Sequence, residues 1–382
     1  MAEVLVVTWD GGGNVPPALG IAGELVRRGH RVRFLGHERQ RSSVEDAGFG
    51  FEAYRHARPY SAIEPLPTPK AIVAIFGMFT DGGPGVDLRE LFGRQPADLL
   101  VIDGMSLGAL KAAYGLSVPV VALMHTYHQF FVNRWARGPI GLLGTVRGRS
   151  PRRLWARAAH VLVAASRDLD PASDSLPGNV THVGVVQAPV RPGPKTEPPR
   201  ILVSLSTIFY GGQAETLQAV LDALAGPDGS KRIDADVMVT TGDTIDPLSL
   251  RAGPNVNVQR YLPHDEVMPS MSLVISHGGH STVMRALCHD VPVLVLPMHP
   301  MLDHKMIGES IAAKGAGLVL PRDTKPVDIA AAIGRLLHDP RYRRAAADLG
   351  ARLRSQPGQE RAADIIEDLL QTQHSHALKD AS

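Results

Sequence analysis

Short apolar runs alternate with segments of helical periodicity along most of the chain. In the first half, apolar runs bounded by polar residues or glycine predict buried parallel strands at residues 4–7, 31–35, 98–103, 118–124, 160–164 and 180–185. Pro16 and Pro17 open a segment of helical spacing that ends at Gly29, and a second helix is predicted over 107–114. Prolines and glycines interrupt the pattern between residues 54 and 89, which we interpret as ligand-facing loops.

The alternation starts again after a proline-rich segment. Residues 187–199 contain five prolines in thirteen residues, which predicts an extended interdomain linker over 189–199. Strands are then predicted at 200–205, 236–241, 256–260, 273–276 and 293–296, and helices at 214–225, 328–337 and 361–370. This order predicts two doubly wound α/β domains of the Rossmann type, residues 1–188 and 200–371, with a flexible tail at 372–382. Ligands bind at the carboxyl ends of such strands, so we expect the two domains to face a central cleft.

Composition narrows the class of protein. A chain of 382 residues is long enough for two domains, and its net charge of +2 gives no reason to expect a nucleic-acid partner. The single cysteine, Cys288, excludes an intrachain disulfide framework and fits a reducing compartment. The first apolar run is too short for a signal peptide, and no apolar stretch is long enough for a transmembrane helix. We therefore expect a soluble, cytoplasmic protein without stable membrane insertion.

Charge is unevenly distributed along the chain. The segment from Gly104 to Arg167 contains neither aspartate nor glutamate. Its basic residues include Arg134, Arg137, Arg147, Arg149, Arg152, Arg153 and Arg157. One interpretation is a solvated basic face. The other is a positive rim for an anionic acceptor, the phosphates of a donor, or a membrane surface.

The segment with the clearest chemistry follows the predicted strand 273–276. It reads His277-Gly-Gly-His-Ser-Thr282 and leads into a predicted helix. Gly278 and Gly279 allow an anion to approach the backbone closely, and the start of a helix attracts negative charge. The hydroxyls of Ser281 and Thr282 and the rings of His277 and His280 add hydrogen-bond donors. We predict a diphosphate site, and neither a Walker loop nor a Gly-x-Gly-x-x-Gly pattern favours ATP or NAD.

This segment resembles the donor site of nucleotide-sugar-dependent glycosyltransferases with two Rossmann domains (the GT-B fold), most closely the actinobacterial enzymes that glycosylate antibiotics and other natural products. Plant and animal UDP-glycosyltransferases are more distant relatives. Tyr261-Leu262 matches the element that holds a pyrimidine base, and Asp303-His304 matches the acidic–Gln pair that binds sugar hydroxyls. The resemblance implies a nucleotide-binding set of Ser206, Thr207, Tyr261, Leu262, His277, Gly279, His280, Ser281 and Thr282. It also implies a donor, TDP- or UDP-sugar, and no cofactor.

Three positions depart from the family's donor site. Arg285 stands where the family has a glutamate that binds the ribose, His304 replaces the glutamine, and Ile307 replaces an asparagine. Arg285 either contacts phosphate or points away. The smaller polar set favours a sugar with fewer hydroxyls, such as a deoxysugar carried on TDP.

The catalytic position departs as well. The family has a histidine or aspartate as general base where this chain has Asn14, and an amide does not accept a proton at working pH. Asp10 is one candidate to replace it, and Asp103 or the loop that begins at His125 is another. In a third interpretation, the reaction needs no strong general base, because the acceptor ionises easily or attacks through carbon. Asp10 and Asp103 also suit purely structural roles, as a helix cap or as a partner that orients a neighbour.

Aromatic residues follow the predicted strand 118–124. They are either core or the wall of an acceptor pocket, and we predict a pocket formed by Phe76, Tyr127, His128 and Phe131. Asp234-Ala-Asp236 resembles the Asp-x-Asp metal element of another glycosyltransferase fold. It precedes its strand and lacks further ligands, so we interpret it as a solvated loop and expect no metal site.

Together these features lead to one hypothesis with two alternatives. The hypothesis is a metal-independent, inverting hexosyltransferase that moves a sugar from TDP or UDP to a small-molecule natural product. The acid-free segment with Trp135 and Trp155 favours instead a membrane-surface transferase with a lipid acceptor. Asn14 and Ile307 favour a catalytically impaired relative that binds nucleotide and assists another protein. The expected partners are the nucleotide sugar and the acceptor, and we also consider a homodimer.

Overall fold

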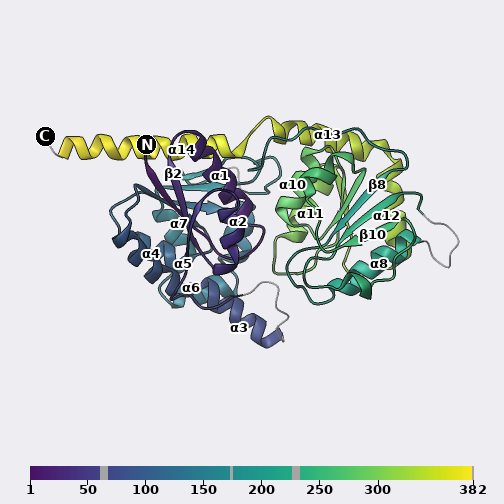
Figure 1. Cartoon of the computed structure of the whole chain (residues 1–382), viewed down its shortest axis with the longest axis horizontal. Coiled ribbons are helices and arrows are strands. Elements are labelled where there is room, and N and C mark those ends of the chain that lie inside the picture. Colours follow the sequence, from purple (N-terminus) through teal and green to yellow (C-terminus); the bar gives the residue numbers. More distant parts are fainter. Residues whose placement is uncertain (61–67, 173–174, 226–232, 381–382) are drawn as a thin grey trace. The chain divides into compact units, whose positions relative to one another are not determined.

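The computed structural model describes residues 1–60, 68–172, 175–225 and 233–380. Among these, the chain forms two compact units (Figure 1). The first unit contains the chain up to Ala188 together with the last segment from Gln356, and the second contains Pro189–Ser355. The predicted break near residue 188 agrees with this division. The predicted second domain extended to residue 371, and residues 356–371 belong instead to the first unit.

The first unit is built on a seven-stranded sheet in which all neighbouring strands are parallel. Its strands are β1 (Glu3–Val7), β2 (Arg31–Gly36), β3 (Gly50–Ala53), β4 (Leu99–Asp103), β5 (Val120–Met124), β6 (His160–Val163) and β7 (Val180–His182), in the order β3-β2-β1-β4-β5-β6-β7. Its helices are α1 (Val15–Arg27), α2 (Arg41–Glu45), α3 (Thr68–Phe79), α4 (Gly83–Arg94), α5 (Leu107–Ala113), α6 (Pro139–Val146) and α7 (Pro151–Arg157), with a π-helix at Phe130–Trp135. The sequence predicted six of these strands and did not predict β3.

The interpretation of residues 54–89 as loops is wrong for 68–79 and 83–89, which belong to α3 and α4, and residues 61–67 lie outside the described residues. The glycines of α4 have a packing role. A Cβ atom on Gly85 would collide with the backbone oxygen of Gly108 in α5, and one on Gly108 would collide with the backbone oxygen of Asp81. Glycine therefore lets α4 and α5 approach each other closely, where the sequence suggested a break in structure.

The second unit contains a six-stranded parallel sheet. Its strands are β8 (Arg200–Ser204), β9 (Asp236–Thr240), β10 (Val256–Gln259), β11 (Leu273–Ser276), β12 (Val293–Val295) and β13 (Gly317–Val319), in the order β10-β9-β8-β11-β12-β13. Its helices are α8 (Gln213–Ala225), α9 (His264–Val267), α10 (His280–Cys288), α11 (His304–Ala313), α12 (Pro326–His338) and α13 (Pro340–Arg354). β13 and α13 were not predicted. The two doubly wound sheets confirm the predicted fold class.

The last helix, α14 (Gly358–Asp380), packs against α1 in the first unit (Figure 1). Its apolar face, including Ala362, Ile366 and Leu370, joins the core formed by α1, β1 and β4. On the polar side, Arg28 bonds to Asp364 at 2.6 Å and to Glu367 at 2.7 Å. The segment predicted as a flexible tail from Thr372 is helical as far as Asp380.

The proline-rich segment after Ala188 has no helix or strand among its described residues, and it packs on the second unit. The ammonium group of Lys195 donates to the carbonyl oxygens of Pro269 at 3.3 Å and His289 at 3.2 Å. Burial lowers the pKa of Lys195 to about 8. This part of the linker is therefore held in place by side-chain contacts. In the described part of the chain, no helix has the length and apolar character needed to cross a bilayer.

Each sheet has a point where the strand order reverses. In the first unit it lies between β1 and β4, and in the second between β8 and β11. Connections leave the carboxyl ends of the two central strands in opposite directions there, which opens a crevice for a ligand. The candidate site residues of each unit lie at these two points.

Candidate active site

In the first unit, Asp103 ends β4, and Asn14 and His125 lie in the segments that follow the neighbouring strands β1 and β5. Val7 of β1 is paired with Ile102 of β4, and Asp103 is paired with Leu123 of β5. The segments that continue from these strands therefore leave the sheet at the same edge. Strand register brings together residues that are far apart in the sequence.

Asp103 is the centre of this group. Its Oδ2 atom accepts hydrogen bonds from Nδ1 of His125 at 3.0 Å and from Nδ2 of Asn14 at 3.3 Å. Its Oδ1 atom accepts from the backbone N–H of Met105 at 2.9 Å. Because a carboxylate only accepts, the proton on His125 is assigned to Nδ1 and the lone pair to Nε2. A buried aspartate that orients a histidine in this way is the arrangement of a general base.

The ring of His125 remains accessible from the first unit's surface. Its side chain is 13% exposed, whereas that of Asp103 is 3% exposed. Within the described part of the chain, Nε2 of His125 has no hydrogen-bond partner. An acceptor proton can therefore reach Nε2 while Nδ1 stays bound to Asp103.

Asn14 has a bracing role. Its buried amide also donates from Nδ2 to Oγ1 of Thr8 at 3.1 Å and to the carbonyl oxygen of Trp9 at 3.0 Å. The side chain thus ties the end of β1 to Asp103. This agrees with the expectation from amide chemistry that Asn14 is not itself the base.

Asp10 lies in a different local environment. Its Oδ2 atom is 3.2 Å from Nε of Arg39, and its backbone N–H donates to Nδ1 of His37 at 3.2 Å. Burial raises the pKa of Asp10, and the nearby Arg39 partly offsets this rise. Because Oδ2 of Asp10 already pairs with Arg39, Asp10 is less available to an acceptor than Nε2 of His125.

Aromatic rings surround His125. The ring centroid of His125 is 5.5 Å from that of Phe131 and 6.4 Å from that of Trp9, and Trp9 is 4.9 Å from Phe79. A small apolar pocket beside them is lined by Trp9, His37, Tyr54, Ala57, Arg58, Met78, Phe79, Asp81, Pro84, Met105 and Ser106. Phe79 was not predicted. Phe76, which was, lies one turn earlier on α3 and is half-buried.

The other predicted acceptor residues lie deeper in the unit. Tyr127 and Phe131 are fully buried. His128 belongs to a buried polar cluster, in which its backbone N–H donates to Oδ2 of Asp170 at 2.6 Å and Nε2 of His182 lies 2.7 Å from the same oxygen. Burial lowers the pKa of His128. Of the four predicted residues, Phe131 is in ring contact with His125 at a centroid distance of 5.5 Å.

In the second unit, the loops after β8 and β11 share one edge of the sheet, because Ser276 is paired with Ser204. Gly278 has φ of +94°, and a Cβ atom there would lie 2.6 Å from the backbone oxygen of His304. A Cβ atom on Gly279 would lie 2.6 Å from Nε2 of His277. Gly278 is therefore required for the turn between β11 and α10, whereas a side chain at Gly279 would have to displace the ring of His277.

Helix α10 begins at His280 directly after this turn, with Gly279 as its N-cap. The backbone N–H groups of His280, Ser281 and Thr282 have no acceptor within the helix, as in the first turn of any α-helix. No acidic residue lies in that turn. The amides of this turn and the helix dipole favour a bound anion, and the diphosphate site stays a prediction.

A cluster of histidines lies against this turn. The rings of His277 and His304 are 4.6 Å apart and nearly perpendicular, and Tyr210 is 5.4 Å from His304. Burial lowers the pKa of His277 to about 4 and, together with the nearby His277 and His299, that of His304 to about 2. In the described residues, Nδ1 of His277 and Nδ1 of His304 are buried without a hydrogen-bond partner. Both rings are neutral near pH 7 and have unused hydrogen-bonding capacity.

The remaining predicted donor residues surround the same edge. The Oγ atom of Ser206 accepts from the N–H of Ile208 at 2.9 Å, and its carbonyl oxygen accepts from Gln213 at 3.1 Å. Thr207 and Tyr261 are exposed, Leu262 is half-buried, and Asp303 is the N-cap of α11. The loop after β8 and the start of α10 thus lie at the same edge of the sheet. The donor-binding roles of these residues stay predictions.

Two of the positions that differ from the donor site of the resembling family, Arg285 and Ile307, have structural contacts in this chain. Nη1 of Arg285 lies 2.9 Å from Oδ1 of Asp265, so this arginine is held in an ion pair. Ile307 is fully buried in α11.

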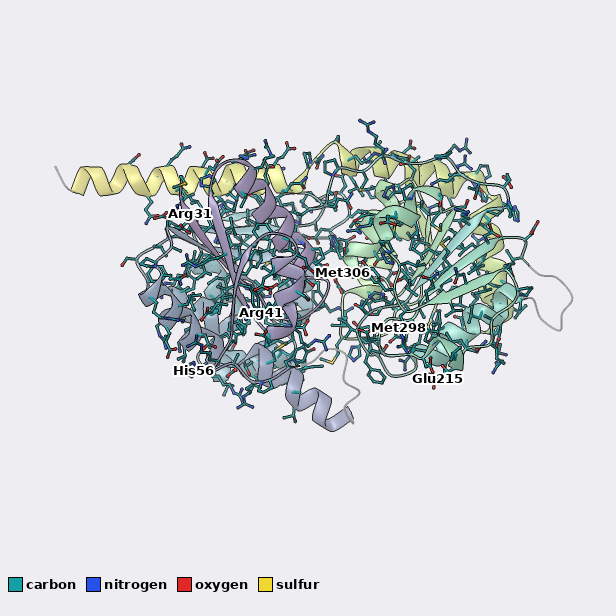
Figure 2. The ribbon with its side chains drawn as sticks, in the orientation of Figure 1. Arg31, Arg41, His56, Glu215, Met298 and Met306 are labelled. Carbon is teal, nitrogen blue, oxygen red and sulfur yellow. The ribbon has the colours of Figure 1, made fainter. Side chains whose placement is uncertain are left out.

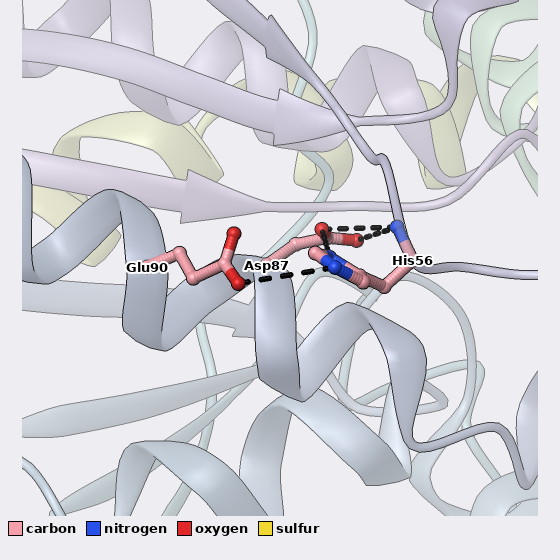
Figure 3. Close-up of side chains that lie close together, drawn as sticks. All are labelled: His56, Asp87 and Glu90. Atoms are coloured by element: carbon pink, nitrogen blue, oxygen red, sulfur yellow. Dashed lines mark hydrogen bonds and ion pairs between the residues drawn. The ribbon is translucent and has the colours of Figure 1, made fainter.

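The sequence did not predict one polar cluster, which is formed by His56, Asp87 and Glu90. His56, which lies at the surface of the first unit (Figure 2), has Nδ1 2.7 Å from Oδ1 of Asp87 and Nε2 3.8 Å from Glu90 (Figure 3). The carboxylate of Asp87 also accepts the backbone N–H groups of His56 at 3.1 Å and Ala57 at 3.2 Å. The hydrogen bond to Asp87 raises the pKa of His56. Because the Asp87 oxygens are already bonded to two amides and an imidazole, this cluster fastens the segment after β3 to α4.

Comparisons with known proteins show which proteins this chain is similar to. Residues 219–369 match the family described as erythromycin biosynthesis protein CIII-like, C-terminal domain. The 4'-demethylrebeccamycin synthase of Lentzea aerocolonigenes is 27% identical over 97% of this chain and 100% of its own. The calicheamicin glycosyltransferase CalG4 has a TM-score of 0.78 at 23% identity, covering 97% of this chain and 98% of that structure. The glycosyltransferase VinC in complex with dTDP has a TM-score of 0.67 at 19% identity, over 97% and 98% of the two chains.

Proposed function

We propose that this chain, whose residues 219–369 match the erythromycin biosynthesis protein CIII-like C-terminal domain and whose fold is that of GT-B glycosyltransferases, is an inverting, metal-independent hexosyltransferase. Its donor is a pyrimidine nucleoside diphosphate sugar, with TDP or UDP as the nucleotide. Its acceptor is a small-molecule natural product. The observation that carries this proposal is the bond between Asp103 and His125, whose ring contacts Trp9 and Phe131.

The acceptor is activated by His125. Its Nε2 atom takes the proton from an O–H or N–H of the acceptor while Asp103 stabilises the imidazolium that forms. The acceptor atom attacks the anomeric carbon, and the bond from that carbon to the diphosphate oxygen breaks on the opposite face. The electron pair leaves with the diphosphate, so the anomeric configuration inverts.

The leaving diphosphate is stabilised at the start of α10. The amides of His280, Ser281 and Thr282 and the helix dipole supply positive potential where negative charge develops. His277 and His304 are neutral and can donate N–H groups without a permanent charge of their own. These donors supply the charge stabilisation that a metal ion provides in other transferases.

Two features support the choice of nucleotide and sugar. The exposed ring of Tyr261 is available to stack on a pyrimidine base, and the structurally similar VinC was solved with dTDP. The side chain of Ile307 is apolar and buried, and Arg285 is bound to Asp265. Fewer polar groups are then left for the sugar and ribose, which favours a deoxysugar on TDP.

The test is a thermal-shift panel of TDP-, UDP- and GDP-sugars, followed by transfer assays with flat, apolar acceptors. We expect TDP- or UDP-sugars to raise the midpoint by mass action and GDP-sugars to have little effect. NMR of the product should show the anomeric configuration opposite to that of the donor. Donor binding without transfer or hydrolysis would contradict the proposed activity and favour the auxiliary-protein alternative. Retention of the anomeric configuration would contradict the inverting mechanism but not the proposed transferase activity.

A further inference from the structure

The first unit contains a second cavity that the proposed reaction does not use. It has a volume of about 410 Å³ and is lined by Gly82, Gly85, Val86, Arg89, Gly108, Lys111, Ala112, Gly115 and Arg149. These residues come from α4, α5 and the segment that follows α6. A volume of this size is within the range of small-ligand sites.

Three cations line this cavity. Within the part of the chain that the structure describes, Arg89, Lys111 and Arg149 form no ion pair, and the cavity lining includes no acidic residue. Arg149 is held in place by its Nη1 atom, which donates to the carbonyl oxygen of Thr80 at 3.2 Å. Arg89 and Lys111 are exposed. Three uncompensated cations around one hollow repel one another, and an anion relieves this repulsion.

The nearest carboxylates have other partners. Asp81 accepts the backbone N–H groups of Arg58 at 2.8 Å and Gly83 at 3.2 Å. Asp87 and Glu90, on the same helix as Arg89, lie against His56 (Figure 3). The acid-free segment from Gly104 to Arg167 supplies both Lys111 and Arg149. The positive charge therefore belongs to the cavity lining itself, while these three carboxylates contact groups outside the lining.

The lining also limits what can bind. Glycines and the small side chain of Ala112 form much of it, and Val86 is its largest apolar residue. No aromatic ring lines the cavity on which a nucleobase or a flat acceptor could stack. The lining suits a compact, strongly hydrophilic polyanion held by Arg and Lys side chains.

We propose that this cavity is a binding site for a compact phosphate-type polyanion, such as a diphosphate or the phosphate of a lipid headgroup. The site is separate from the donor site, because all of its residues belong to the first unit. It adjoins the acceptor-side pocket, since Asp81 and Pro84 line that pocket and Gly82 and Gly85 line this cavity. The proposal does not depend on the transfer activity.

The first experiment titrates the full-length protein with sodium pyrophosphate by calorimetry at about 0.15 M salt, with the donor site saturated by thymidine diphosphate. The test variant is R89A/K111A, which removes two exposed side chains without ion-pair partners among the described residues. The control variant, R137A/R153A, removes the same charge from exposed positions of the basic segment outside the cavity. We expect the Kd to rise about tenfold or more in the test variant and to stay within about twofold in the control.

The second experiment distinguishes the source of the phosphate. Co-sedimentation with phosphatidylcholine vesicles containing phosphatidic acid should be lost in R89A/K111A and kept in R137A/R153A if the ligand is a lipid headgroup. Pyrophosphate binding without vesicle binding assigns a free polyanion. The proposal is overturned if the two variants weaken binding equally, or if the unmodified protein binds neither probe. Circular dichroism spectra of both variants should match that of the unmodified protein.

Discussion

Nδ1 of His125 lies 3.0 Å from Oδ2 of Asp103, and the same oxygen accepts a hydrogen bond from Asn14. The asparagine occupies the position where the resembling family has its base. In this chain it helps to hold the aspartate, and a histidine from the next strand end approaches the aspartate from another side. The histidine bound to Asp103 thus comes from the end of β5, the strand next to β4 in the sheet.

Replacement of His125 by alanine should lower kcat by about 10²–10⁴-fold, because the group that takes the acceptor proton is removed. The KM for the donor should change little, since the donor residues lie in the other unit. D103N should also lower kcat and alter the pH–rate profile, because a neutral partner no longer stabilises the imidazolium. Initial rates with a saturating donor measure both effects.

D10N is the matched control for this prediction. Asp10 is paired with Arg39, so its loss should leave kcat within about threefold. The assignment of the base to His125 is wrong if D10N abolishes transfer while H125A remains active.

Gly278 should not tolerate alanine. Its φ of +94° is unfavourable for a residue with a Cβ atom, and that atom would lie 2.6 Å from the backbone oxygen of His304. We expect G278A to destabilise the protein by about 1–3 kcal/mol and to weaken nucleotide binding. In G334A, the added Cβ meets nothing within 4 Å, so its unfolding midpoint should be unchanged or slightly raised. Urea denaturation and nucleotide titration of both variants check this, and equal behaviour of the two would contradict it.

The regular elements followed from the sequence where the apolar pattern was strong. β3 and β13 were missed because β3 is half-exposed and β13 has three residues. α4 was missed because its glycines resemble loop residues, although Gly85 serves close packing against α5. α14 was recognised as amphipathic, but nothing local to it indicates that its apolar face packs on α1.

The sequence predicted which strand ends carry the candidate site residues, but it did not predict the contacts between these residues. His277–Thr282 has the glycines and donors of an anion site within a few residues of one another. Asp103 and His125 were singled out because each follows a strand, but the bond between them depends on the pairing of β4 with β5. Phe79 was missed because α3 was interpreted as loop, and His56 lies in the irregular segment that follows β3.

Acid should destabilise the second unit through His277 and His304. Burial lowers the pKa of His277 to about 4 and that of His304 to about 2, below the value near 6.5 expected in the unfolded chain. The unfolded state therefore binds more protons in this window, so stability is full above about pH 6.5 and falls as the pH decreases toward 4. H304Q should flatten this dependence. Urea midpoints between about pH 7 and pH 4.5 measure it, and a midpoint that is independent of pH would contradict the two histidines being buried and neutral.

The docking of α14 should contribute directly to the stability of the first unit. Ile366 is fully buried in the core that α14 shares with α1 and β1, so I366A should cost about 2–5 kcal/mol. D368A, on the exposed side of the same helix, should change stability by less than about 0.5 kcal/mol. The three tryptophans, Trp9, Trp135 and Trp155, all belong to the first unit, so their fluorescence reports its unfolding. If I366A leaves the fluorescence-detected midpoint unchanged, α14 does not stabilise this unit.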